Sequence, residues 1–309
     1  MRILMTNHAL ASPGGTETFV MTTALALKAA GIDVWVYTPG YGEAAERLAA
    51  AGVPVVRDPS EAPPPDVIHG QHQAVRAACA AFPDVPRLFM AHGTVPPEEQ
   101  PPDDLPFGAY LAASDGVAEH LRAAHGIEDV EIIRNGLDMA PWSALPPPQT
   151  APTRVLLLKN VVEPAAEGAL SAACGALGVA YERIVGQPAW DVVAAVGRAD
   201  VVVTWGRGAL EAMAAGRTTI GFGHGNLIDG AITPDNFEAL RFRSFSGRVG
   251  AIPCSPDAFA AEIRRHDVAV AAAVALRVHA EHDVQTTAAR LAAVYRRLAD
   301  EARTDTGRP

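Results

Sequence analysis

The sequence predicts an α/β protein with two Rossmann-like domains, each a parallel sheet covered by helices. Short apolar segments alternate with helical segments along most of the chain, which is typical of βα units. A proline-rich stretch, APWSALPPPQTAP at 140–152, interrupts this alternation, which then starts again. The length of 309 residues fits two domains of about 150 residues each.

The first half of the chain opens with MRILMTN, which we interpret as a buried strand. A helix is expected from TETFVMTTALALKAAG, because the glycine at its end is a normal stop signal. The helices QAVRAACAAF and GVAEHLRAAHG separate several of the remaining short strands. Those strands are DVWVYTP, DVIHG, RLFMAHG, AYLAAS and VEIIRNG.

The second half repeats the pattern, with a strand at RVLLLKN and a helix near 164–177. It continues with the segments VAYERIVG, WDVVAAVGRA, DVVVTWG, LEAMAAG and RTTIGFG. The apolar residues Val284, Ala288, Leu291, Tyr295 and Leu298 form one stripe on a terminal helix. Such a helix needs a surface on which to pack.

Proline disfavours helix in the residue before it, so we expect a linker at 141–153. This prediction divides the chain into an N-terminal domain at 1–140 and a C-terminal domain at 154–280. A final helix with a flexible tail follows at 281–309.

Composition limits the classes of function. The net charge of −10 and the pI near 5.4 speak against a nucleic-acid partner, which usually requires a basic surface. Cys79, Cys174 and Cys254 are too far apart for a disulfide framework or a metal cluster, and we interpret them as free thiols. The first residues lack a signal peptide, and the longest apolar run is too short to span a bilayer. We therefore expect a cytoplasmic protein with no transmembrane segment.

Ligands of parallel sheets bind beyond the carboxyl ends of the strands. The first such junction, NHALASPGGTE at 7–17, has Gly14 and Gly15 before a helix whose N-terminus would attract an anion. It is not the GxGxxG fingerprint, which speaks against a nicotinamide cofactor. The alternative is a flexible loop in which Thr16 caps the helix.

The second junction is FMAHGT, where His92 follows an apolar strand and precedes Gly93. Its position at a strand end makes it a candidate catalytic residue, and a structural histidine is the alternative. His69 and His72 follow another strand in HGQH. Because no spaced carboxylate or cysteine set accompanies these histidines, we predict no metal site.

The third junction is DVVVTWGRGALEAMAAG, a strand, a turn and a helix. Gly206 and Gly208 would offer amides to a diphosphate, and Arg207 would add positive charge. Glu211 lies one turn into the helix and could accept hydrogen bonds from ribose hydroxyls. The alternatives are an exposed Arg207 and a salt-bridge or helix-dipole role for Glu211.

A glycine-rich turn follows the next strand, with His224, Gly225 and Asn226 in the segment GHGN. It could close over a sugar or a nucleotide. An ordinary surface loop explains this composition equally well.

Several segments together resemble the GT-B-fold glycosyltransferases, in particular the retaining, nucleotide-sugar-dependent family four. They are PGGTE, DVIHGQH, AHG, LAASDGVAEHL with VEIIRNGLDM, and LEAMAAGRTTI. The resemblance extends over nearly the whole chain. It implies two Rossmann-like domains facing across a cleft, with the acceptor on the first, the donor on the second and the last helix packed back on the first. It also implies no cofactor and no essential metal, because amides and basic side chains neutralise the diphosphate.

The resemblance implies a hexosyltransferase that moves a sugar from a UDP- or GDP-sugar to an acceptor hydroxyl with retention. His92 would contact the donor sugar near the reacting carbon, and His72, Asn135, His224, Gly225 and Asn226 are further possible contacts. The expected donor-binding residues are Gly14, Gly15, Lys159, Gly206, Arg207, Gly208 and Glu211.

Two departures from the family pattern concern the donor. Val203 stands in place of the family's first glutamate, and Lys159 is the cation retained from an arginine–lysine pair, with Arg207 as a candidate substitute. A nucleotide-sugar epimerase of the same fold is an alternative. A non-catalytic nucleotide-sugar-binding protein is another, which Val203 favours.

Overall fold

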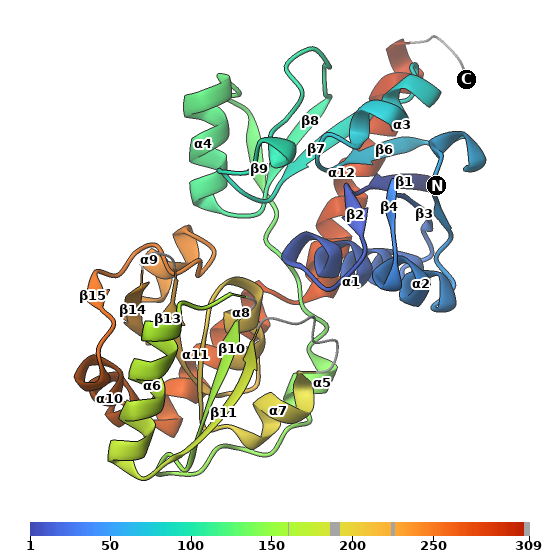
Figure 1. Ribbon diagram of the computed structural model, residues 1–309. Helices are drawn as coiled ribbons and strands as arrows, with labels where there is room; N and C mark the ends of the chain where they lie inside the picture. Colours follow the sequence, from blue (N-terminus) through green and yellow to red (C-terminus); the bar gives the residue numbers. More distant parts are fainter. Residues whose placement is uncertain (160, 186–191, 224–225, 306–309) are drawn as a thin grey trace. The chain divides into compact units, whose positions relative to one another are not determined.

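The computed structural model describes residues 1–159, 161–185, 192–223 and 226–305. The chain divides into two compact units (Figure 1). Unit 1 contains Met1–Gly136 and Val284–Pro309, and unit 2 contains Leu137–Asp283. The chain therefore passes from one unit to the other twice, after Gly136 and after Asp283.

Unit 1 contains a seven-stranded sheet in the order β5-β3-β1-β6-β7-β8-β9. All neighbouring pairs are parallel, and Ile3 of β1 lies opposite Val34 of β3. β1 is the apolar N-terminal segment, which fits a central strand covered on both faces. A second, two-stranded sheet pairs β2 (Ala9–Leu10) with β4 (Gly40–Tyr41). The strands of the main sheet are β1 (Arg2–Thr6), β3 (Asp33–Tyr37), β5 (Val55–Val56), β6 (Val67–Gly70), β7 (Arg87–Ala91), β8 (Ala109–Ala112) and β9 (Val130–Ile132).

Helices cover both faces of this sheet. On one face, Ile68 and Phe89 share a core with Val75 of α3 (Val75–Ala81) and Val117 of α4 (Asp115–His125). On the other face, α12 (Val284–Asp305) contacts β6 and α1 (Gly15–Ala29). The apolar stripe of α12 is buried there. The remaining helices are α2 (Glu43–Ala50) and the short 3-10 helices η1 (Pro59–Glu61) and η2 (Pro97–Glu99).

Unit 2 contains a six-stranded sheet in the order β11-β10-β12-β13-β14-β15. The first four strands in this order are parallel, as the sequence predicted for the sheet. The last two pair antiparallel, which the sequence analysis did not anticipate. The strands are β10 (Arg154–Lys159), β11 (Ala180–Val185), β12 (Val201–Thr204), β13 (Thr218–Phe222), β14 (Leu227–Ala231) and β15 (Ile252–Pro253).

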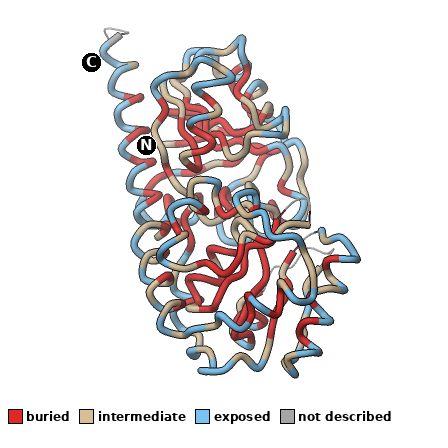
Figure 2. Tube along the Cα trace, turned by 90° about the vertical axis from the view of Figure 1, so that its left-hand side faces the viewer, coloured by how far each residue is buried: buried red, intermediate tan, exposed pale blue. Residues whose placement is uncertain are grey.

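Two cores enclose the unit 2 sheet. One contains residues of α5 (Ala140–Ser143), α7 (Val193–Arg198), α8 (Gly206–Ala214), α9 (Phe237–Phe242) and α11 (Val268–Glu281). The other contains residues of α6 (Pro164–Leu177) and α10 (Pro256–Arg264). Figure 2 shows buried residues along the strands of each unit. In unit 2, as in unit 1, the carboxyl ends of the parallel strands lead into loops at one edge of the sheet.

The proline-rich stretch corrects our prediction of a linker at 141–153, because it is part of unit 2. Trp142 is buried in a core of that unit, and Arg217 donates a hydrogen bond to the Pro146 carbonyl at 2.6 Å. The Asp200 carboxylate accepts hydrogen bonds from the amides of Gln149 and Thr153, both at 2.8 Å. The stretch begins with the short helix α5, whose Pro141 is tolerated in the first turn, and side chains of unit 2 hold the rest in place.

Replacing Asp200 by alanine should lower the free energy of unfolding by about 2–4 kcal/mol, since several amides would lose their charged acceptor. Burial raises the pKa of Asp200, but hydrogen bonds from Gln149, Thr153 and Arg154 outweigh it and hold the pKa below its usual value. The stabilisation is therefore present above about pH 4 and lost as the pH falls through the lower folded-state pKa. Urea denaturation checks this prediction. The exposed Asp235→Ala is the control, and equal stability of both variants would contradict it.

Candidate functional site

In unit 2, Lys159 is the last residue of β10 and lies at the carboxyl edge of the sheet. Its Nζ donates hydrogen bonds to the carbonyls of Phe222 and Gly223, both at 3.2 Å. The same atom lies 3.9 Å from the ring centroid of Phe222 and 4.5 Å from that of Trp205. Lys159 is only 6% exposed, and burial lowers its pKa to about 8. The sheet edge thus holds a buried ammonium among carbonyl dipoles and aromatic faces.

The turn from β12 to α8 is one residue long, Trp205. Gly206 has a positive φ of 55° and its amide donates to the Phe245 carbonyl at 2.7 Å. This corrects the expectation that the Gly206 amide is available to a diphosphate. A side chain at Gly208 would put its Cβ 2.5 Å from the Thr204 hydroxyl, so glycine is required there by packing. A phosphate would therefore depend on other groups of this turn and on Lys159.

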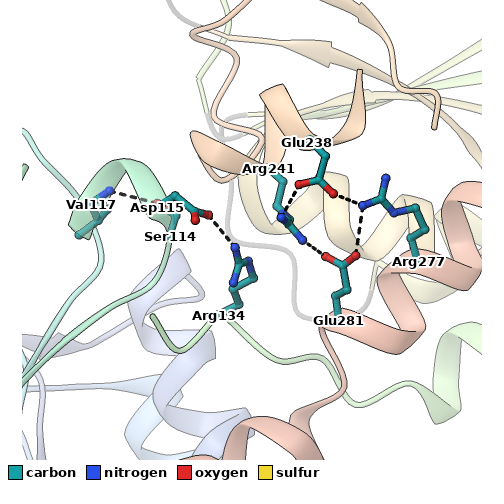
Figure 3. Close-up of polar contacts among 8 residues, drawn as sticks. All are labelled: Ser114, Asp115, Val117, Arg134, Glu238, Arg241, Arg277 and Glu281. Atoms are coloured by element: carbon teal, nitrogen blue, oxygen red, sulfur yellow. Dashed lines mark hydrogen bonds and ion pairs between the residues drawn. The ribbon is translucent and has the colours of Figure 1, made fainter. Parts of the chain in front are cut away.

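The Phe245 carbonyl that accepts from the Gly206 amide follows α9, and ion pairs join α9 to α11 (Figure 3). Arg241 and Arg277 each pair with both Glu238 and Glu281. Phe245 itself is buried, and its ring lies 5.2 Å from that of Phe237 on α9. The turn opposite α8 is therefore anchored.

Glu211 is paired with Arg207 on the same helix. Arg207 Nε donates to Glu211 Oε1 at 3.0 Å, and the two side chains are only 17% and 15% exposed. Their i,i+4 spacing places them on one face of α8. Burial raises the pKa of Glu211, and Arg207 opposes that rise. The structure therefore revises the idea that Arg207 adds unbalanced positive charge, because a carboxylate already balances it.

The other candidate residues of unit 2 provide less support for a donor-binding site. Val203 is fully buried within β12, opposite Leu157 and Ile220, so it offers no carboxylate to a sugar. Asn226 has a positive φ of 57°, and its carbonyl accepts a hydrogen bond from the Cys254 amide at 3.0 Å. His224 and Gly225 lie outside the described residues.

In unit 1, polar side chains gather where β6 and β7 end. His92 Nε2 lies 2.5 Å from Gln71 Oε1, and the His92 ring meets Phe19 edge-on with centroids 4.6 Å apart. Burial, helped by His72 and His69, lowers the pKa of His92 well below its usual value, although a hydrogen bond with Asn135 opposes the effect. His92 is therefore a neutral imidazole at pH 7.

His72 belongs to the same group, with the two rings 6.5 Å apart. It has a positive φ of 57°, which is uncommon for a residue other than glycine. Its Nδ1 accepts from the His8 amide at 3.3 Å, and burial lowers its pKa to about 4. His69 lies within β6; its ring is 6.3 Å from that of Phe19, and its Nδ1 is 2.5 Å from the hydroxyl of Tyr295 on α12. Its contacts assign His69 to packing.

Asn135 follows β9 in a segment anchored by its neighbour. Arg134 pairs with Asp115 at 2.6 Å, at the start of α4, where Ser114 caps the helix (Figure 3). Asn135 is thereby held in unit 1 within hydrogen-bonding reach of His92.

The glycine loop before α1 differs from the sequence expectation. The residue at the N-cap is Gly14, not Thr16. A side chain at Gly14 would collide with the Glu17 carboxylate, which also accepts a hydrogen bond from Thr16 at 3.1 Å. The helix start where Gly14 and Gly15 were predicted to meet a phosphate thus carries a carboxylate of its own.

Three residues of these sites were missed from the sequence. Trp205 lies directly before Gly206, and Gln71 lies directly before His72. Their proximity to these candidate residues in the sequence was the signal that could have identified them. Glu99 gave no signal, because only the fold brings its carboxylate over Gly93.

The part of the chain that the structure describes contains no group of three or more potential metal ligands, and Cys79, Cys174 and Cys254 are free thiols. In the same part of the chain, no helix combines the length and apolar character that a bilayer crossing needs.

These sheets and helices define a protein of the GT-B class, with two Rossmann-like domains. Residues 13–140 match the model of Glycosyltransferase Family 4. The resemblance to GT-B glycosyltransferases noted in the sequence is thus confirmed, and the family match supports an enzyme of the glycosyltransferase type.

Three solved structures illustrate the likeness. Alr3699/HepE from Anabaena, in complex with UDP-glucose, has a TM-score of 0.68 at 15% identity, covering 96% of this chain and 100% of that one. A glycosyltransferase from Rickettsia africae has 0.67 at 14%, covering 96% and 98%. AviGT4, a glycosyltransferase involved in avilamycin A biosynthesis, has 0.58 at 16%, covering 97% and 98%. At such identities the likeness shows the fold. No curated protein matches the sequence.

Proposed function

We propose that this chain is a glycosyltransferase that moves a sugar from a UDP- or GDP-sugar to an acceptor hydroxyl with retention, using unit 2 for the donor. The observation that carries the proposal is Lys159. Its buried ammonium lies at the carboxyl edge of the sheet, beside the strand-to-helix turn at Trp205. Nucleotides bind at this edge in open α/β sheets. The UDP-glucose in the structurally similar Alr3699/HepE supports a nucleotide-sugar donor here.

The proposed chemistry rests mainly on charge. Lys159 would stabilise the negative charge that develops on the diphosphate as the sugar leaves. Glu211 would accept hydrogen bonds from the ribose, and its pairing with Arg207 would hold the carboxylate in place. The neutral His92 would contact the donor sugar as a hydrogen-bonding group and not as a cation.

The proposal also covers cofactors, cellular location and macromolecular partners. With Lys159 supplying positive charge, we propose that transfer needs neither a metal nor another cofactor. The free thiols support a cytoplasmic location, where thiols stay reduced. The net charge of −10 supports the absence of a nucleic-acid partner.

A panel of UDP- and GDP-sugars tests the proposal without knowledge of the acceptor. We expect slow release of free UDP or GDP from one nucleotide class, because water can replace the acceptor. Nucleotide release should be lost in Lys159→Met and retained in Lys28→Met, a lysine that also bonds two backbone carbonyls. An epimeric nucleotide sugar as product would identify an epimerase. Binding without turnover would identify a non-catalytic protein.

A further inference from the structure

A second carboxylate lies beside the strand end that carries His92. Glu99 closes η2, and a side chain at Gly93, next to His92, would collide with the Glu99 carboxylate. The loop is fastened by Gln100, whose Nε2 donates to the Pro96 carbonyl at 3.2 Å and whose Oε1 lies 2.8 Å from His120 Nε2. The carboxylate is thus held near His92 by an anchored loop.

Glu17 approaches the same place from α1. The same helix packs Phe19 against the His92 ring, and the charge of Glu17 acts on Glu99. Burial raises the pKa of both Glu17 and Glu99, and the charges of Glu98 and then Glu17 raise that of Glu99 further. The two carboxylates are therefore near enough to repel each other.

Two buried nitrogens in this group lack a partner among the described residues. Gln71 is fully buried; its Oε1 meets His92, but its Nε2 has no hydrogen-bond partner. His72 is 5% exposed, and its Nε2 is likewise unpartnered. Leaving such groups unpaired is costly, so a ligand with polar groups at this place would gain by satisfying them.

On the basis of the function proposed above, we propose that Glu17, Glu99, Gln71 and His72 form the acceptor subsite. We further propose that the acceptor is a polyhydroxyl compound without phosphate or carboxylate groups. Its hydroxyl or ammonium groups would donate to the two carboxylates, and a hydroxyl oxygen would accept from the Gln71 amide.

The charges of Glu17 and Glu99 explain why the subsite would select against anionic acceptors. An anionic acceptor would be repelled by two carboxylates, while His72 and His92 are neutral at pH 7 and do not compensate. An uncharged sugar meets no such penalty, and an amino sugar gains attraction.

The test uses glucose, galactose and mannose, each supplied as the free sugar, the 2-amino sugar and the 6-phosphate. With the donor that gives background nucleotide release, we expect at least one neutral or amino sugar to accelerate release ten times more than its 6-phosphate. Background release with no response to any neutral or amino sugar, or a preference for the 6-phosphates, would overturn the acceptor assignment alone. Absence of background release would overturn the proposed function as well.

Variants connect this selectivity to the carboxylates. In Glu17→Gln and Glu99→Gln, we expect acceptor KM to rise about ten- to a hundredfold and the preference for the amino sugar over the 6-phosphate to shrink. A purely structural role would leave that preference intact. Glu119→Gln removes one exposed negative charge from unit 1 and should leave it unchanged. An unaltered preference in both carboxylate variants would refute the proposal.

Discussion

Replacing Lys159 by methionine should weaken the binding of UDP or GDP by about a hundredfold. A hydrogen-bonded charge pair to phosphate is worth about 1.5–3 kcal/mol, and burial of Lys159 reduces the screening by water. Methionine has a similar length, so the space between Trp205 and Phe222 stays filled. Calorimetry with the diphosphate and with the nucleoside alone checks the prediction. The nucleoside should bind nearly as before, and equal losses for the two ligands would show that Lys159 is structural.

The pH dependence gives an independent check on Lys159. Its pKa is lowered to about 8, and the ammonium is the form that attracts a diphosphate. Affinity for UDP-glucose should therefore be constant below that pH and fall about tenfold per unit above it. Lys159→Met should bind weakly at every pH, with no such slope. A wild-type affinity that is flat between pH 7 and 9.5 would remove Lys159 from the site.

Much of the unit 2 site follows from local sequence pattern. An apolar run ending in Lys159, and another ending before GRG, predict that both segments reach the same sheet edge. The pattern could not predict what Lys159 contacts there, because Phe222 ends a strand, and Gly223 follows it, more than sixty positions away. The Phe245 carbonyl that accepts from the Gly206 amide lies on a different segment of the chain, and no residue type in the sequence predicts that contact.

The unit boundary illustrates a different limit. Proline content reports which backbone conformations a segment can adopt, and it predicted a linker in a stretch that in fact begins with the short helix α5 (Ala140–Ser143). It does not report tertiary anchors such as Asp200 or the burial of Trp142. The passages between units after Gly136 and Asp283 have no comparable composition. A boundary of this kind depends on long-range packing, which a single sequence does not display.

The Arg207–Glu211 pair should show both a stability effect and a binding effect. Removing either charge leaves the other largely buried without its partner, so Arg207→Gln and Glu211→Gln should each lower the free energy of unfolding by about 1–3 kcal/mol. The double variant should lose less than the sum of the two. The exposed i,i+4 pair Glu43–Arg47 is the matched control and should show much weaker coupling in the same denaturation experiments.

Binding separates a ligand role for Glu211 from a purely structural one. If its carboxylate accepts ribose hydroxyls, Glu211→Gln should weaken binding of the nucleoside alone by about ten- to a hundredfold under conditions where the variant is fully folded. Arg207→Gln should weaken the nucleoside less, because the carboxylate remains. Calorimetry at low temperature, with folding verified by circular dichroism, measures both. Arg207 already donates a hydrogen bond to one carboxylate oxygen of Glu211. If Glu211→Gln is less stable but binds the nucleoside normally, Glu211 serves only to neutralise Arg207.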